Sequence, residues 1–183
     1  MRPINRAVFL DRDGVINQAV VREGKPYPPS LVSEVVIPEG AESALHKLND
    51  AGFLLVGITN QPDVARGTQQ KAVVEEINHY LMDKFLITEI FVCYHDDSDN
   101  CNCRKPKPAL FFQAAEKYEI DLSNSYMIGD RWKDVEAGQN AGCKTIFIDF
   151  KYNEKQPSSI TTKRVTSLVE ASLWILNNEL WRK

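Results

Sequence analysis

Two aspartates directly after an apolar run are the residues of this sequence best suited to chemistry. Ala7–Leu10 has the composition of a buried strand, and Asp11 and Asp13 follow it at once. Two carboxylates this close repel each other unless a cation or a shared proton intervenes. We expect Mg²⁺, because it takes oxygen ligands from one or two carboxylates and completes its shell with water and phosphate. A surface turn is the alternative interpretation, since Asp and Gly both favour turns.

Polar residues also follow three later apolar runs. They are Thr59-Asn60-Gln61 after Phe53–Thr59, Arg104–Pro108 after Glu89–Tyr94, and Gly129–Asp134 after Ser125–Ile128. Because the ends of parallel strands lie along one edge of a sheet, these groups and the two aspartates are expected to converge on one crevice. Each has a structural explanation by itself, since a Thr can end a strand, a Lys is commonly solvated and acids favour helix N-termini. Their occurrence together, in this order, favours a single functional site.

The residue types at this crevice are those that phosphoryl transfer requires. A carboxylate that attacks phosphorus needs its own charge and that of the phosphate offset by a cation. The side chains of Asp11 and Asp130, with the backbone carbonyl of Asp13, are the expected Mg²⁺ ligands. Thr59 and Lys105 can hold the phosphoryl oxygens. The Asp13 side chain can protonate the leaving oxygen and later deprotonate the hydrolytic water.

Three of the four cysteines gather in one short segment. Cys93, His95, Cys101 and Cys103 form a Cys-x-His…Cys-x-Cys pattern. Three thiolates and one imidazole suit a tetrahedral, structural Zn²⁺ site. The linking residues 96–100 are acidic and polar, so a metal would fold them where no core can. The alternative is three free buried thiols and a surface His. Cys143 stands apart, and we expect it to be a small buried residue.

The four polar groups resemble the motifs of the haloacid dehalogenase (HAD) superfamily of phosphatases. The matching residues are Asp11-Arg12-Asp13-Gly14, Thr59, Lys105 and Gly129-Asp130-x₃-Asp134, within about residues 7–148. The roles that the resemblance implies are nucleophile for Asp11, general acid and base for Asp13, phosphoryl stabilisers for Thr59 and Lys105, and third Mg²⁺ ligand for Asp130. A receiver domain also uses acids, a Thr and a Lys, but it lacks the late Gly-Asp-x₃-Asp.

The Cys/His segment makes the chain similar to two HAD families, the D-glycero-D-manno-heptose 1,7-bisphosphate phosphatases and the histidinol-phosphatase domains, which have little or no cap domain. The heptose resemblance implies that Arg104 contacts the substrate, and the arginine fork suits a second phosphate. The other substrate contacts that we expect are Arg12, Asn60, Gln61 and Arg131. The chain departs from the heptose pattern at Pro62–Val64 and Gln18–Arg22, where we expect the sugar to be read.

The apolar runs alternate with helical patterns, which predicts an α/β fold with a Rossmann-like parallel sheet and helices on both faces. The predicted strands are the four named above and Lys144–Ile148. We expect five helices. The first begins at about Ala41 and ends before Gly52, the second runs from an N-cap at Thr68 to Phe85, and the third begins at Pro108. The fourth spans about residues 133–140 and the fifth about residues 167–180. Asn17–Pro38 is typical of an irregular surface loop. We expect one HAD-like phosphatase domain over 1–183, with a zinc loop at about 93–103.

The composition limits the partners. The chain has 183 residues and a net charge of −3, so it has the size of one domain and no basic surface for nucleic acid. No apolar run reaches the roughly 20 residues needed to span a bilayer, and the first residues leave no room for a signal peptide. We expect a monomeric cytoplasmic enzyme that acts on a small phosphorylated sugar, with no nucleic-acid or membrane partner. Histidinol phosphate is the alternative substrate, and a non-catalytic zinc-bearing binding module is the alternative of another class.

Overall fold

A parallel β-sheet forms the centre of the computed structural model, which describes residues 4–157 and 161–180. Its six strands lie in the order β5-β4-β1-β6-β7-β8, and every adjacent pair is parallel. The strands are β1 (Arg6–Leu10), β4 (Phe53–Asn60), β5 (Glu89–Cys93), β6 (Tyr126–Gly129), β7 (Lys144–Ile148) and β8 (Lys163–Val165). This arrangement confirms the predicted α/β class, although the short edge strand β8 was not predicted.

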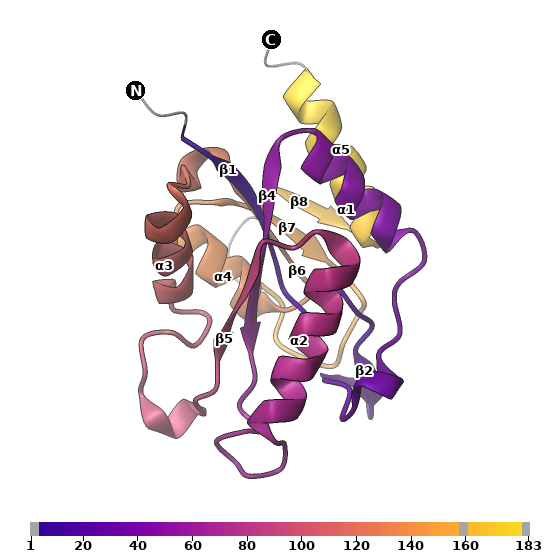
Figure 1. Cartoon of the computed structure of the whole chain (residues 1–183), viewed down its shortest axis with the longest axis vertical. Helices are drawn as coiled ribbons and strands as arrows, with labels where there is room; N and C mark the ends of the chain where they lie inside the picture. The colour runs from indigo at the N-terminus through magenta and orange to yellow at the C-terminus, as the bar shows by residue number, and fades with distance from the viewer. Residues whose placement is uncertain (1–3, 158–160, 181–183) are drawn as a thin grey trace.

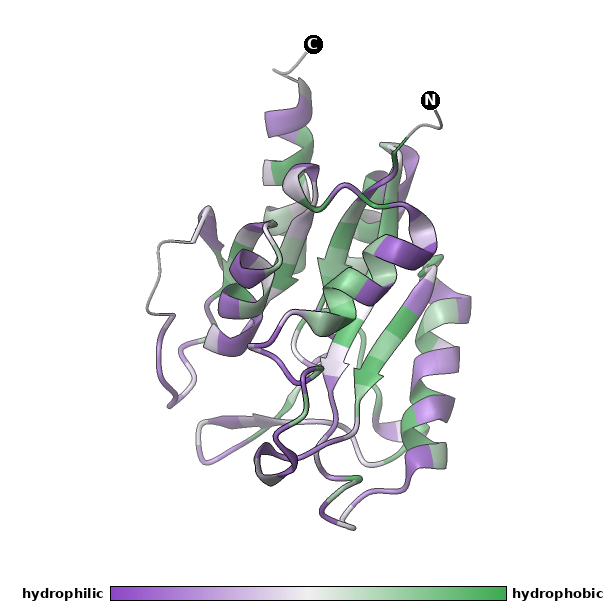
Figure 2. Ribbon diagram, turned by 90° about the vertical axis from the view of Figure 1, so that its left-hand side faces the viewer, coloured by the Kyte–Doolittle hydropathy of each residue, from purple (hydrophilic) through white to green (hydrophobic). Residues whose placement is uncertain are grey.

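Helices cover both faces of the sheet (Figure 1). They are α1 (Ala41–Asp50), α2 (Lys71–Phe85), α3 (Ala109–Tyr118), α4 (Trp132–Asn140) and α5 (Leu168–Leu180), with 3₁₀ turns η1 (Val32–Glu34), η2 (Asp97–Asp99) and η3 (Leu122–Asn124). Val8 and Leu10 of β1 pack in the apolar cluster under α1, α2 and α5, while Phe9 packs in the cluster under α3 and α4. The apolar residues accordingly gather on the strands and the inner helix faces (Figure 2).

A β-hairpin lies in the segment that was predicted to be an irregular loop. Its strands are β2 (Val20–Arg22) and β3 (Lys25–Tyr27), paired antiparallel. The two turn residues, Glu23 and Gly24, both have positive φ (52° and 74°), as a type I′ hairpin turn requires. The prediction was wrong because Glu-Gly is a weaker turn signal than Asn-Gly, and because Pro26 within a strand argues against one. The backbone N–H of Asn153 donates to Gly24 O at 2.8 Å, which joins the hairpin to the segment after β7.

The start of α2 also differs from the prediction. The helix begins at Lys71, and Thr68 does not cap it. The backbone N–H of Thr68 donates to Asp63 O at 2.9 Å, and its hydroxyl donates to the same oxygen at 3.3 Å, so it closes the loop that follows Gln61. At the other end of the chain, Trp174 of α5 packs edge-on against the Tyr126 ring with centroids 6.4 Å apart.

The connections that leave the strands hold the hairpin and the Cys/His segment, and the described residues contain no separate cap domain. Within the same residues, no helix is long and apolar enough to cross a membrane. Residues 1–3, on which the expectation about a signal peptide rests, lie outside the described part. The assignment of all 183 residues to one domain likewise extends beyond it and stays a prediction.

Candidate active site

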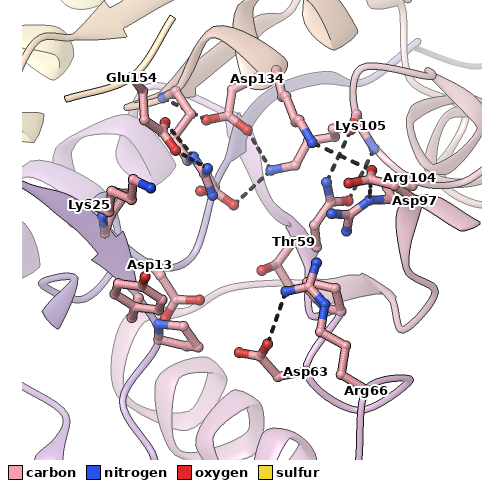
Figure 3. A pocket seen from close by; sticks show the side chains of 18 residues that line it. Asp13, Lys25, Thr59, Asp63, Arg66, Asp97, Arg104, Lys105, Asp134 and Glu154 are labelled. Carbon is pink, nitrogen blue, oxygen red and sulfur yellow. Dashed lines mark hydrogen bonds and ion pairs between the residues drawn. The ribbon is translucent and has the colours of Figure 1, made fainter. Parts of the chain in front are cut away.

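The strand ends bring the predicted acids, threonine and lysine together at one pocket. Asp11 follows β1, Thr59 lies near the end of β4, Lys105 comes from the loop after β5, and Asp130 follows β6. All four side chains are buried. A cavity of about 260 Å³ opens beside them, and it is lined by Asp11, Asp13, Thr59, Lys105 and Asp134, which we call its floor. Figure 3 labels the last four of these residues. The parallel sheet is what gives these residues, distant in sequence, a common location.

Lys105 is the buried cation at the centre of this pocket. Its ammonium donates to Asp11 Oδ1 at 2.7 Å and to the backbone carbonyl of Ile58 at 2.6 Å, and it forms an ion pair with Asp134 Oδ1 at 2.6 Å. Burial alone would lower the pKa of Lys105, but the two carboxylates outweigh it and raise the pKa above its ordinary value. Lys105 therefore carries its positive charge between two acids.

The three carboxylates around Lys105 leave an excess of negative charge. Burial, with Asp134 close by, raises the pKa of Asp11 to about 7. Burial and the Asp11 charge raise the pKa of Asp130 as well. Neither Asp130 oxygen makes a geometrically satisfied hydrogen bond among the described residues. The neighbouring Tyr152 hydroxyl favours the ionised form and lowers the pKa of Asp130, but burial and the Asp11 charge outweigh it. Burial of carboxylate oxygens without a hydrogen bond costs folding free energy, unless a bound ligand contacts them.

This donor set fits a divalent cation. One oxygen each from Asp11, Asp130 and Asp134 lie within 4.8 Å of one another. Gly14 lets the chain approach closely, because a Cβ there would stand 1.8 Å from Asp130 Oδ2. Hard oxygen ligands with open positions are what Mg²⁺ takes in phosphoryl-transfer sites. Asp11 and Asp130 can hold the ion, while Asp134 is already committed to Lys105.

Asp13 is held by four N–H groups rather than left free at the pocket wall. Arg12 donates to both of its oxygens at 3.1 and 3.0 Å, Asn17 donates to Oδ1 at 3.1 Å, and Gln61 donates to Oδ2 at 2.7 Å. The Arg12 side chain is fully buried, and it also donates to Asn78 Oδ1 at 3.0 Å. A network of this kind fixes the direction of the Asp13 carboxylate.

Arg12 and Gln61 therefore differ from the expectation that they contact substrate. Neither side chain lines the pocket, and both are buried behind it. Gln61 spans Asp13 and the Thr59 hydroxyl, to which it donates at 2.9 Å. The physical reason is that motif residues at a strand end alternate between the ligand side and the core side. These two residues position Asp13 and Thr59.

Asn60, Arg104 and Arg131 do line the pocket. The Asn60 amide is bonded to the backbone of Lys105 in both directions, at 3.1 and 3.2 Å, so it ties the Lys105 loop to β4. Arg104 donates to Asp97 Oδ1 at 2.7 Å. Arg131 is paired with Glu154, with one hydrogen bond at 2.9 Å. The two arginines thus reach the pocket with their charges already compensated.

The outer wall of the pocket comes from several loops. Pro62 and Asp63 belong to Pro62–Val64, where we expected the sugar to be read. The other residues were not predicted: they are Lys25, Pro26 and Tyr27 from the hairpin, Pro28 directly after it, Arg66 from the loop after β4, and Asp97, Lys133 and Glu154. Gln18–Arg22, where we expected the sugar to be read, does not line this pocket. Gln18 and Val21 border a separate, mostly apolar hollow. Lys133 lies inside the Gly-Asp-x₃-Asp motif and could have been singled out, but nothing in the sequence marked Lys25 or Glu154.

The four Cys/His residues form a compact cluster at the end of β5. The Cys103 sulfur lies 3.1 Å from that of Cys93 and 3.5 Å from that of Cys101, and 3.3 Å from His95 Nδ1. Four ligands at about 2.3 Å from a tetrahedral zinc would place sulfurs about 3.8 Å apart, so the donors are gathered as zinc requires. Burial raises the pKa of the Cys93 and Cys103 thiols, which leaves them weak anions unless a metal binds. Cys143 is buried elsewhere.

Comparisons with known proteins agree on a family. The HAD-hydrolase-like family model matches residues 102–161. A D-glycero-beta-D-manno-heptose-1,7-bisphosphate 7-phosphatase of Helicobacter pylori is 36% identical over 161 residues, covering 85% of this chain and 90% of the relative. The alpha-specific counterpart from Photorhabdus laumondii is 34% identical, covering 78% and 81%.

A solved structure gives the same result. The D,D-heptose 1,7-bisphosphate phosphatase of B. bronchiseptica, complexed with magnesium and phosphate, superposes with a TM-score of 0.81 at 27% identity. The match covers 94% of this chain and 99% of that one.

Proposed function

This chain belongs to the HAD-like phosphatases, in the family of the heptose-1,7-bisphosphate 7-phosphatases, and we propose that it removes one phosphate from D-glycero-D-manno-heptose 1,7-bisphosphate through an aspartyl-phosphate on Asp11. Relatives named for both anomers resemble it about equally, at 36% and 34% identity. The proposal therefore covers the sugar bisphosphate and leaves the anomer to experiment.

The observation that carries the proposal is the buried Asp11–Lys105–Asp134 arrangement with the unpartnered Asp130 beside it. Lys105 contacts Asp11 at 2.7 Å, so it stands where it can meet a phosphoryl group on that carboxylate. The Thr59 hydroxyl lines the same cavity and can donate to a second phosphoryl oxygen. A binding module would have no need for acids whose burial costs this much.

The reaction proposed here has two in-line displacements. An Asp11 oxygen bonds to phosphorus while the ester bond breaks, and Asp13 gives its proton to the leaving sugar oxygen. Water then bonds to phosphorus, its proton goes to Asp13, and the Asp11–phosphorus bond breaks. Throughout, Lys105 and Thr59 hold the phosphoryl oxygens.

A bound Mg²⁺, held by Asp11, Asp130 and the backbone carbonyl of Asp13, is part of this proposal. The chemistry that it supplies is the offset of charge between the nucleophile and the phosphate. The excess of carboxylates over cations on the pocket floor, and the two orphaned oxygens of Asp130, support it.

A structural zinc at the Cys/His cluster is the second metal of the proposal. The loop that carries the cluster leads directly into Arg104 and Lys105, so the zinc would fix the position of both. Clustered thiols without disulfides are typical of a reducing compartment, which favours a cytoplasmic location. We also propose that the protein is a monomer and that it acts on a small phosphorylated sugar.

Phosphate release tests the proposal. Purified protein with Mg²⁺ would be given both anomers of heptose 1,7-bisphosphate, histidinol phosphate and simple sugar monophosphates. We expect kcat/KM for one heptose bisphosphate anomer to exceed that for every other compound by at least about tenfold, and EDTA to abolish the activity. An identically purified Asp11→Asn variant controls for contaminating phosphatases. A preference for histidinol phosphate would replace the proposed substrate, and activity that survives EDTA would contradict the metal.

A further inference from the structure

The cations of the pocket are not equally available to a ligand. Six line it, namely Lys25, Arg66, Arg104, Lys105, Arg131 and Lys133. Four of the six donate a hydrogen bond to a carboxylate oxygen: Arg66 to Asp96, Arg104 to Asp97, Lys105 to Asp11, and Arg131 to Glu154. Lys25 and Lys133 have no such bond among the described residues. The four bonded cations therefore meet an incoming anion with part of their charge compensated and some N–H groups engaged, whereas, within the part of the chain that the structure describes, the two lysines keep all of their N–H groups available.

Lys133 is the more constrained of these two lysines. It stands in the first turn of α4, and its side chain is only 21% exposed. Its ion pair is with Asp97 Oδ1 at 3.6 Å, beyond hydrogen-bond distance. That same oxygen accepts from Arg104 at 2.7 Å, and the Asp97 side chain is 68% exposed. A single solvated carboxylate thus serves two cations, and Arg104 is the nearer.

The surroundings of Lys133 are also positive. Burial lowers its pKa first of all, the charges of Arg104 and Arg131 lower it further, and Asp97 opposes them only in part. A half-buried ammonium that interacts with two guanidinium groups, and shares its counter-ion with Arg104, is incompletely compensated. A phosphate dianion bound beside Lys133 would neutralise the positive charge of this region, whereas an apolar or neutral group of a ligand would not.

We propose that Lys133 recognises the second phosphate of the bisphosphate substrate, in addition to any contact that Arg104 makes. This inference rests on the proposed function, since it assumes that a second phosphate is present. Arg104 is the residue that the family resemblance suggested for this role, but its guanidinium is fixed by Asp97 and by the backbone carbonyl of His95 at 3.3 Å. Arg104 therefore reaches a phosphate only with the N–H groups that remain unbonded, whereas Lys133 makes no hydrogen bond among the described residues and can turn its whole ammonium to the phosphate.

Lys25 is the alternative cation, and its position makes it the weaker candidate. It extends from the exposed hairpin, on the side of the pocket opposite Arg104 and Asp97 (Figure 3). An exposed lysine loses much side-chain entropy when it is fixed on a ligand. Lys133 is already restrained by its burial, so it loses less and keeps a stronger interaction with the phosphate.

The test compares two substrates that differ only in the second phosphate. Heptose 1,7-bisphosphate and heptose 7-phosphate would be assayed with wild-type protein and with Lys133→Met. We expect the ratio of their kcat/KM values to fall by about tenfold to a hundredfold in the variant, mainly through a higher KM for the bisphosphate. Inhibition by the product heptose 1-phosphate should weaken by a similar factor, with inhibition by inorganic phosphate as the reference.

Lys155→Met is the matched control. The Lys133 ammonium lies 5.6 Å from the centroid of the Trp132 ring, and that of Lys155 lies 4.0 Å from the same centroid. Lys155 pairs with Glu136, but it does not line the pocket. In Lys155→Met, the ratio of kcat/KM for the bisphosphate to kcat/KM for the monophosphate should stay within about twofold of the wild-type ratio. Lys133→Gln, which keeps a polar end, should lower the ratio in the same direction as Lys133→Met.

Two results would overturn the inference while leaving the proposed function intact. One is a bisphosphate preference that Lys133→Met does not change, and the other is a larger loss in Lys25→Met than in Lys133→Met. A wild-type enzyme with no preference for the bisphosphate would instead overturn the proposed substrate, and this inference with it.

Discussion

The floor and the rim of the pocket use charge in different ways. On the floor, Lys105 is 3% exposed and lies within 2.7 Å of oxygens from two buried carboxylates. On the rim, Arg66 and Arg104 pair with Asp96 and Asp97, in which the acid or the base is partly solvated. A buried pair interacts strongly and is costly to disturb, whereas an exposed pair is worth about 0–1 kcal/mol.

The two regions are also built on different elements. Residues of the floor lie at or after the ends of strands β1, β4, β5 and β6, whose positions are set by the apolar clusters on both faces of the sheet. The rim is the outer wall of the pocket, and it consists of the hairpin, the loop after β4, the Cys/His loop, Lys133 of α4 and the segment after β7. We infer that the floor fixes the chemistry and that the rim selects the substrate, which is the common division of labour between a scaffold and its loops.

The largest expected effect is that of Asp11→Asn on the floor. Loss of the nucleophile removes the covalent route, so kcat should fall by about 10⁴-fold or more. The protein should remain folded, because the change removes a buried charge whose pKa is already raised to about 7. Phosphate release and thermal unfolding measure the two outcomes.

Asp63→Asn is the matched change on the rim. Asp63 lines the same pocket but pairs only with the exposed Arg66, at 3.3 Å. Its kcat should stay within about threefold of wild type, as an exposed pair allows. Equal losses in the two variants would erase the distinction between floor and rim.

An intermediate effect is expected from Cys101→Ser. This variant tests whether the Cys/His loop holds Lys105 in position on the pocket floor. Zinc content by elemental analysis should fall well below one per chain, because a structural site needs all four ligands. Since Lys105 follows this loop, kcat/KM should fall by about tenfold to a hundredfold. Cys143→Ala, at a buried cysteine outside the cluster, should leave the zinc content unchanged. Full zinc content in Cys101→Ser would refute the site.

The smallest effect is the pH dependence of Mg²⁺ binding. Metal ligands must be ionised, and burial with Asp134 nearby raises the pKa of Asp11 to about 7 in the metal-free protein. Below that pH Asp11 is protonated, so its ionisation alone should raise the affinity by about tenfold from pH 6 to pH 8, and the raised pKa of Asp130 acts in the same direction. Calorimetric titration measures it. An affinity that is constant from pH 6 to 8 would contradict the raised pKa or the role of Asp11 as a ligand.

The sequence predicted the floor better than the rim for a physical reason. Apolar runs that end on Asp11, Thr59 and Asp130 report the sheet and its edge directly, because burial forces the pattern. The hairpin wall escaped prediction because β2 and β3 bury little, so their sequence carries no alternation. Glu154 was not predicted as a pocket residue because its place depends on how the segment after β7 folds back to the pocket, and tertiary contacts decide that path.

Arg12 and Gln61 show that the direction of a side chain is harder to predict from the sequence than its position along the chain. Their place beside the motif aspartates and threonine was evident, but the sequence does not state which way a side chain turns. Both turn inward to Asp13, Gln61 through a hydrogen bond of 2.7 Å. Such direction is decided by packing, here against Asn78 of α2, and not by the spacing of residues along the chain.

The most direct test of the account is the stereochemical course at phosphorus. A phosphorothioate analogue of the sugar bisphosphate, chiral by oxygen isotopes at the reacting phosphorus, would be hydrolysed in water of a third isotope. Two in-line displacements, first by Asp11 and then by water, each invert the configuration, so the account predicts net retention. Net inversion would show that water attacks the substrate directly, and would contradict an aspartyl-phosphate on Asp11.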